Sequence, residues 1–138
     1  EHEARLVIWD ATTGDRAAVL EGNYGNLPMF LPGDKAVALT RFDKEGDLTV
    51  RVHSLPEGKE VVSKKLPGPI EFAARLVGVS ADGKLLAVNL GGAKGKQTAT
   101  LFLDTKSLDE VARWTGPAKP IYFGHTDGRF TPDGKRFV

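Results

Sequence analysis

Few side chains in the sequence could carry catalytic or metal chemistry, and those few are far apart. The three histidines are His2, His53 and His125. A metal centre needs clustered ligands, and no two of these histidines are four residues apart, as two ligands on one helical turn would be. The sequence contains no cysteine, which excludes disulfide bonds and thiolate metal sites. We therefore predict no metal centre built on histidine or cysteine.

Two short strings come close to motifs for nucleophilic catalysis and phosphate binding. Residues 78–82 read Gly-Val-Ser-Ala-Asp, which lacks the second glycine of a nucleophile elbow and fits a hairpin turn around Ser80. Residues 91–96 read Gly-Gly-Ala-Lys-Gly-Lys, which misses the P-loop spacing by one residue. Gln97 then stands where a magnesium-binding Ser or Thr is needed. We interpret both strings as turns between strands.

An acidic alternation at Asp43, Glu45 and Asp47 loosely resembles a calcium loop. Asp47 falls at a position that has no ligand in such loops, and no glutamate closes the loop. We interpret this stretch as a solvated hairpin of mixed charge. The sequence therefore predicts no catalytic residue, no metal and no bound cofactor, and we do not expect the chain to be an enzyme.

The elements around these residues form a repeat of short strands and tight turns. Residues 80–84 read Ser-Ala-Asp-Gly-Lys and precede an apolar strand, and Thr-Pro-Asp-Gly-Lys recurs at 131–135, 51 residues later. A degenerate copy, Leu-Pro-Gly-Asp-Lys, lies at 31–35, 49 residues before the middle copy. In each string the aspartate and glycine favour a tight turn, because aspartate caps it and glycine tolerates positive φ.

Two further markers recur with a similar period. A strand that ends in a turn occurs at residues 6–14, 48–58 and 98–105. Three markers with one period predict units of about 45–50 residues, each with four short antiparallel strands, and an all-β fold. The third marker is a glycine after each unit, spaced by 46 and 48 residues: Gly22, Gly68 and Gly116.

This pattern resembles WD-repeat β-propellers. Residues 130–135 stand where the family has Phe-Ser-Pro-Asp-Gly-Lys, and Trp9 with Asp10 stands where its Trp-Asp dipeptide closes the third strand. The dipeptide is His-Ser at 53–54 and Leu-Asp at 103–104, and the family's Gly-His pair is missing, so the Asp–His–Ser–Trp network is not expected in any unit. The resemblance implies β-propeller blades, each a four-stranded antiparallel meander.

The resemblance also implies one partial propeller domain over residues 1–138. Its parts are a blade remnant at 1–22, blades at 23–68 and 69–116, and a partial blade at 117–138. Closed propellers have about 4–8 blades, so we expect a longer parent chain to supply the others, with association of copies as the alternative. The start Glu-His-Glu-Ala indicates an excised piece, and without a targeting signal the compartment stays open.

Two structural details depend on the repeat. Residues 107–110 fit a helix capping box that could begin a short helix over 107–114. The repeat instead makes these residues a turn and an outer strand, which is the interpretation we favour. We also expect Trp9 and Trp114 to pack between neighbouring blades.

Composition narrows the classes of partner. The 19 basic and 18 acidic residues leave a net charge of +1, which gives no electrostatic reason to expect nucleic acid as a partner. No apolar stretch approaches the roughly 18 residues that a membrane-spanning helix needs. Charged residues make up 27% and apolar residues 41%, as in ordinary globular domains.

The resemblance implies a protein-interaction scaffold that presents propeller rim loops to a protein partner. One alternative is a structural or sensor segment of a larger multidomain protein. Another is a propeller enzyme of the hydrolase, lyase or quinoprotein type, with His53 and His125 as the residues to test. The candidate contact residues lie in four loops: Asn23, Tyr24, Asn26, Asp43, Glu45, Lys94, Lys96, Tyr122, His125 and Asp127.

Overall fold

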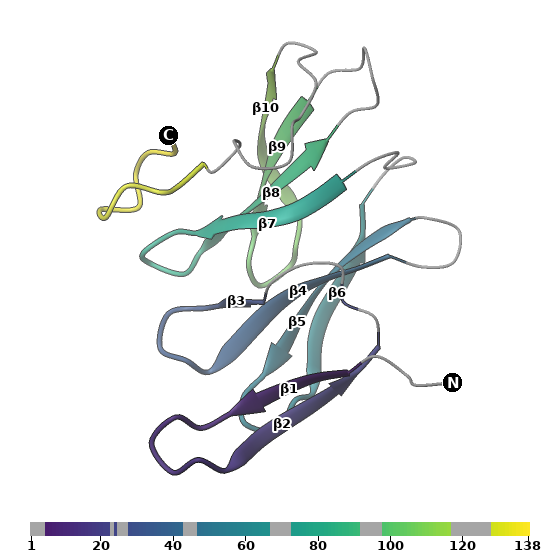
Figure 1. The fold of residues 1–138 in the computed structure, drawn as a ribbon. Helices are drawn as coiled ribbons and strands as arrows, with labels where there is room; N and C mark the ends of the chain where they lie inside the picture. Colours follow the sequence, from purple (N-terminus) through teal and green to yellow (C-terminus); the bar gives the residue numbers. More distant parts are fainter. Residues whose placement is uncertain are drawn as a thin grey trace.

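The chain folds into antiparallel β-sheets, which confirms the predicted all-β class. The computed structural model describes residues 5–22, 24, 28–42, 47–66, 73–91, 98–116 and 128–138. These residues form ten strands and no helix (Figure 1). Accordingly, none of them belongs to a helix long and apolar enough to span a membrane.

The strands pair in chain order into three sheets. Sheet 1 is a two-stranded hairpin, whereas sheets 2 and 3 are four-stranded meanders of the predicted kind. Sheet 1 consists of β1 (Arg5–Trp9) and β2 (Arg16–Glu21). Sheet 2 consists of β3 (Met29–Phe30), β4 (Ala36–Phe42), β5 (Leu48–Ser54) and β6 (Glu60–Lys65). Sheet 3 consists of β7 (Ala73–Val79), β8 (Leu85–Gly91), β9 (Thr98–Asp104) and β10 (Glu110–Gly116).

The sheets stack face to face, and sheet 2 lies between the other two (Figure 1). Successive side chains of a strand point to opposite faces, so β4 contacts sheet 1 with one face and sheet 3 with the other. Ala38 packs into an apolar cluster shared with sheet 3, while Val37 and Leu39 pack into a second cluster shared with sheet 1. Burying such a valine or leucine side chain contributes about 1.5–3 kcal/mol, so these two clusters hold the stack together.

A turn with the same main-chain pattern closes the last hairpin of each sheet. The amides of Gly14, Gly58 and Leu108 each donate to the carbonyl four residues earlier, at 2.8, 2.9 and 2.8 Å. All three residues have positive φ, at 77°, 68° and 58°. Leu108 thus lies in the turn that leads into strand β10, and residues 107–114 form no helix. The repeat predicted these residues correctly, and the helix interpretation was wrong.

The turn after the first strand of each unit also repeats. The amides of Leu31, Ser80 and Thr131 each donate to the carbonyl five residues later, at 2.9, 2.9 and 2.8 Å. In sheet 3 this turn is joined to the last one, because Thr105 Oγ1 donates to the Gly83 carbonyl at 2.6 Å. In sheet 2 the Leu55 amide donates to the Lys35 carbonyl at 2.8 Å, which makes the same link.

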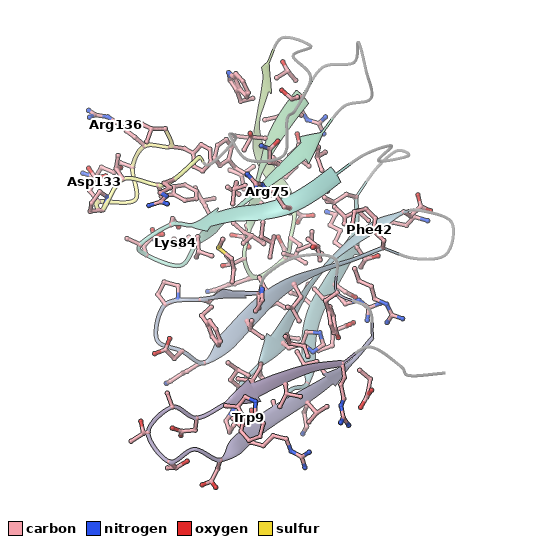
Figure 2. All side chains as sticks on the ribbon, viewed as in Figure 1. Trp9, Phe42, Arg75, Lys84, Asp133 and Arg136 are labelled. Carbon is pink, nitrogen blue, oxygen red and sulfur yellow. The ribbon has the colours of Figure 1, made fainter. Side chains whose placement is uncertain are left out.

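These turns gather at one end of the stack, which we call the turn end. An ideal Cβ placed on Gly83 would lie 3.3 Å from Pro32 of the preceding unit, and one on Gly134 would lie 3.3 Å from the Ala81 amide. The turns of neighbouring units are therefore in contact. Figure 2 shows Lys84, Asp133 and Arg136 on this side of the molecule and Phe42 on the opposite side, which we call the loop end.

We predicted that Trp9 and Trp114 pack between neighbouring blades, but among the described residues neither side chain is packed in this way. Trp9 is 62% exposed and Trp114 is 56% exposed. Ile8 points into the cluster with sheet 2, so its neighbour Trp9 points to the outer face of sheet 1. Trp114 lies on the outer strand β10, with its indole ring over Gly116.

Candidate functional site

The predicted contact residues fall mostly outside the described part of the chain. Of the ten, only Tyr24 is described. It forms a single antiparallel bridge with Arg41 near the end of β4, which places it at the loop end. The nine that lie outside the described residues are Asn23, Asn26, Asp43, Glu45, Lys94, Lys96, Tyr122, His125 and Asp127.

Tyr24 lies between sheet 1 and sheet 2, with its ring against the apolar cluster of those sheets. Its hydroxyl donates a hydrogen bond to the Glu21 carbonyl at 3.1 Å. Partial burial raises the pKa of the Tyr24 hydroxyl above its usual range, and the positive charges of Arg51 and Arg41 oppose that shift. The hydroxyl is therefore a neutral donor at physiological pH, held by the main chain of β2.

Gly22 lets the Arg41 side chain approach the end of β2. An ideal Cβ at Gly22 would lie 3.2 Å from Arg41 Nη1 and 3.3 Å from Arg41 Cζ, and the residue has a φ of +130°. A larger residue would therefore push the guanidinium away. This gives a local physical reason for the glycine that ends the first unit.

An ion pair on sheet 2 lies beside Tyr24. Arg51 Nη1 lies 2.8 Å from Glu60 Oε2, and the Ser63 hydroxyl donates to Glu60 Oε1 at 2.8 Å. Both oxygens of the Glu60 carboxylate thus have partners. The Arg51 side chain is 29% exposed and that of Glu60 is 38% exposed, so solvent weakens the pair.

His53 continues the same face of β5 toward the turn end. It is 6% exposed, and its Nδ1 lies 3.1 Å from the Gly58 carbonyl. Among the described residues, His53 Nε2 and Arg51 Nε are buried nitrogens without a hydrogen-bond partner. An Nδ1–H donor to Gly58 leaves Nε2 as an acceptor in apolar surroundings, so the imidazole acts here as a packed, turn-supporting group.

We call this set the Tyr24 cluster; its members are Tyr24, Arg41, Arg51, His53, Glu60 and Ser63. The loop containing Tyr24 was a sequence prediction, but the ion pair beside it was missed. The available signal was the alternation in β5, where Leu48, Val50 and Val52 are buried against sheet 3. The polar residues between them must then share the opposite face of β5.

The other side chains that could catalyse a reaction or bind a metal have structural roles. The Ser80 hydroxyl donates to Asp82 Oδ1 at 2.7 Å and accepts from the Leu85 amide at 2.9 Å, so it is used within its turn. The hydrogen bond from Ser80 holds the pKa of the Asp82 carboxyl below its usual range. In the part of the chain that the structure describes, no group of three or more histidine or acidic residues could hold a metal ion.

Within the Tyr24 cluster, Tyr24 and Arg41 lie at the loop end, whereas His53 and Glu60 adjoin the turn between β5 and β6. Comparison with known proteins adds no relative to this description: no family model matches the chain, and no curated protein matches it.

Proposed function

We propose that the chain forms WD-repeat-like propeller blades and acts as a protein-interaction scaffold with no chemistry of its own. The observation that supports this most is the stacking of the sheets through two continuous apolar clusters. Such a stack fixes the spacing of the connections between its strands. Loops held at fixed spacing lose little entropy on binding, which suits them to recognition of a partner.

The loop end is the better candidate for the partner surface. At the turn end, the side-chain oxygens of Ser80, Asp82 and Thr105 are already bonded within or between the turns. At the loop end, β4 and β8 finish and β5 and β9 begin. In the sequence, four of the predicted contact residues stand between these strands: Asp43, Glu45, Lys94 and Lys96. Arg41, which is bridged to Tyr24, adds a charged group at the same end.

The test compares two matched double charge reversals. Lys94→Glu with Lys96→Glu changes a loop-end connection, and Lys84→Glu with Lys135→Glu changes the turn end. The wild-type chain is used to capture a partner, and the affinity of that partner is then measured for each variant. We expect affinity to fall about tenfold or more for the loop-end variant and to change little for the turn-end variant.

Other outcomes would replace this proposal. Equal affinity for all three chains would remove the loop end as the interface. Capture by a longer parent chain but not by this one would favour a structural segment. A measurable turnover that is lost on His53→Ala or His125→Ala would favour an enzymatic role.

A further inference from the structure

Two positions on β5 carry ionisable side chains where the matching strand of sheet 3 carries leucines. His53 and Leu103 each stand one residue before the turn that closes the last hairpin of their sheet. Two residues earlier on the same strands are Arg51 and Leu101. Both leucines are buried in the cluster that sheets 2 and 3 share. The contact of sheet 2 with sheet 3 is therefore apolar at two positions where sheet 2 presents ionisable groups on its other face.

His53 lies within the contact between sheet 2 and sheet 1. It is directly opposite Val37 on β4, which is fully buried in the cluster that these two sheets share. The Gly58 carbonyl, 3.1 Å from His53 Nδ1, belongs to a turn that touches sheet 1. An ideal Cβ on Gly58 would lie 3.1 Å from Leu20 Cδ2 and 3.5 Å from Ala18 Cβ. The turn that the imidazole supports therefore packs directly on β2.

The surroundings of His53 suit a neutral imidazole. With Nδ1 as the donor to Gly58, the ring leaves Nε2 without a proton. Among the described residues, Nε2 is buried and has no hydrogen-bond partner. A second proton would turn this atom into a charged donor inside the contact. Burial of an unpaired charge is strongly unfavourable, so the charged ring requires the contact to open.

The charged groups nearest to His53 on sheet 2 are already paired with each other. Glu60 stands opposite His53 on β6, but its two carboxylate oxygens have Arg51 and the Ser63 hydroxyl as partners. Arg51 is itself positive, so it opposes a second positive charge on the same face of β5. The ion pair therefore does not replace the partner that a charged imidazole would need.

The other elements at this contact offer His53 apolar side chains or groups that point elsewhere. From sheet 1, the cluster receives the side chains of Ile8, Ala18 and Leu20. The remaining titratable and charged groups of the adjoining strands and turns are either exposed to solvent or lie toward the loop end: Arg16, Tyr24, Lys35, Arg41, Glu57 and Lys59.

We propose that His53 makes the contact between sheets 1 and 2 sensitive to pH: protonation of its imidazole loosens sheet 1, while sheets 2 and 3 stay packed. Histidine side chains change charge between about pH 5 and 8. The neutral ring fits the contact and the charged ring does not, so sheet 1 is held at neutral pH and loosened as the pH falls. Leu103, at the equivalent place between sheets 2 and 3, does not titrate. This device does not depend on the proposed function.

The test is hydrogen exchange of the backbone amides at about pH 7.5 and pH 5.5, corrected for the intrinsic effect of pH on exchange. A two-stranded hairpin alone is marginally stable in water, so a loosened sheet 1 should lose protection. One linked proton changes an equilibrium by at most tenfold per pH unit. We expect the amides of β1 and β2 to exchange about tenfold faster at the lower pH, relative to those of β8 and β9.

Variants of His53 show whether this residue causes the effect. His53→Leu introduces the residue that sheet 3 has at this position, and it should abolish the dependence on pH. His53→Asn keeps an amide that can donate to Gly58 but does not titrate, so it should give the same result if the leucine variant does not fold. His2→Gln and His125→Gln are the matched controls, because each removes another histidine and should leave the effect unchanged.

Four results would overturn the proposal. The first three are equal protection of sheet 1 at both pH values, an effect that persists in both His53 variants, and an equal loss of protection in sheet 3. The fourth comes from an NMR titration of the imidazole: a His53 ring that takes up its proton while sheet 1 stays protected would show that Glu60 accepts the second N–H. Partner capture through the loop end is measured at about pH 7.5, where sheet 1 is held, so failure of one proposal is distinguished from failure of the other.

Discussion

Leu108 and Gly58 adopt the same left-handed backbone conformation at equivalent places in sheets 3 and 2. Their φ angles are 58° and 68°, and each amide closes the same turn. A residue with a Cβ atom pays about 1–2 kcal/mol in this conformation. Leu108 is fully buried in the cluster between sheets 2 and 3, so the contacts of its side chain offset that strain.

Because of that strain, we expect the glycine variant at position 108 to be more stable than the alanine variant, which reverses the usual order of these two residues. Leu108→Ala removes buried methyl groups and keeps the strain, so we expect it to cost about 3–5 kcal/mol. Leu108→Gly removes the strain as well, so it should cost about 1 kcal/mol less than Leu108→Ala. Equilibrium unfolding in urea measures both values. A glycine variant that is less stable than the alanine variant would show that the left-handed conformation is not strained here.

Gly58 and Gly14 offer a matched pair that separates strain from crowding. Both have positive φ, but an ideal Cβ at Gly58 would lie 3.1 Å from Leu20 Cδ2, whereas nothing lies within 4 Å of one at Gly14. Gly14→Ala should cost about 1 kcal/mol, from strain alone. Gly58→Ala should cost about 1 kcal/mol more, because it also pushes the turn away from sheet 1. Equal losses in thermal unfolding would mean that Leu20 moves aside freely.

Acid should weaken the turns through their aspartates. The amides of Ser107 and Lys106 hold the pKa of the Asp104 carboxyl below its usual range, and the amides of Thr12 and Thr13 do the same for the pKa of Asp10. A carboxyl whose pKa is lower in the folded state stabilises the fold above its unfolded pKa, and this is lost as pH falls through the folded pKa.

We therefore expect the melting temperature to decrease once the pH is lowered beyond about 4. The variant Asp104→Asn should be less stable at neutral pH and should lose less stability on acidification. Calorimetry from pH 6 down to pH 2.5 measures both slopes. Parallel curves for the two proteins would contradict the assigned role of the carboxylate.

The Arg51–Glu60 pair, which joins β5 to β6, can be compared with a pair on sheet 3 that lies within the single strand β10. Arg113 Nη2 lies 2.7 Å from Glu110 Oε2, and Glu110 holds the same position in its strand as Glu60. A double-mutant cycle with Arg51→Ala and Glu60→Ala should give a coupling of about 0.5–1 kcal/mol, because Ser63 also orients the carboxylate. In the Arg113–Glu110 pair the arginine makes two hydrogen bonds, at 2.8 and 2.7 Å, but its side chain is more exposed than that of Arg51. The cycle on that pair should give about 0.2–0.5 kcal/mol. The reverse order would show that the second hydrogen bond of Arg113 outweighs the contribution of Ser63.

Features that depend on neighbouring residues in the chain could be predicted from the sequence. The Asp-Gly-Lys strings set their own turns, and Asp82 Oδ1 indeed accepts the Lys84 amide at 3.1 Å. The spacing of those turns then fixed the number and direction of the strands. The last turn of sheet 3 has Leu108 where the matching turns of sheets 1 and 2 have glycine. This turn could be predicted only by combining the repeat period with the local sequence.

Features that depend on packing between sheets could not be predicted in the same way. The alternation of β5 showed that Arg51 and His53 share a face, but not that sheet 1 would cover that face and that Tyr24 would lie beside Arg51. The error over Trp9 has the same origin. Size and apolarity favour burial, but the direction of the side chain was decided by Ile8, which packs on sheet 2.

The link between Thr105 and Gly83 has a further consequence. In sheet 3 a threonine hydroxyl and a main-chain amide make this link, whereas in sheet 2 the amide of Leu55 alone reaches Lys35. The shape that recurs from unit to unit is therefore maintained by main-chain amides and carbonyls, which every residue except proline supplies in full. Substitutions can accumulate at the signature side chains without loss of that shape, so the units of this chain are free to diverge in sequence while their architecture is conserved.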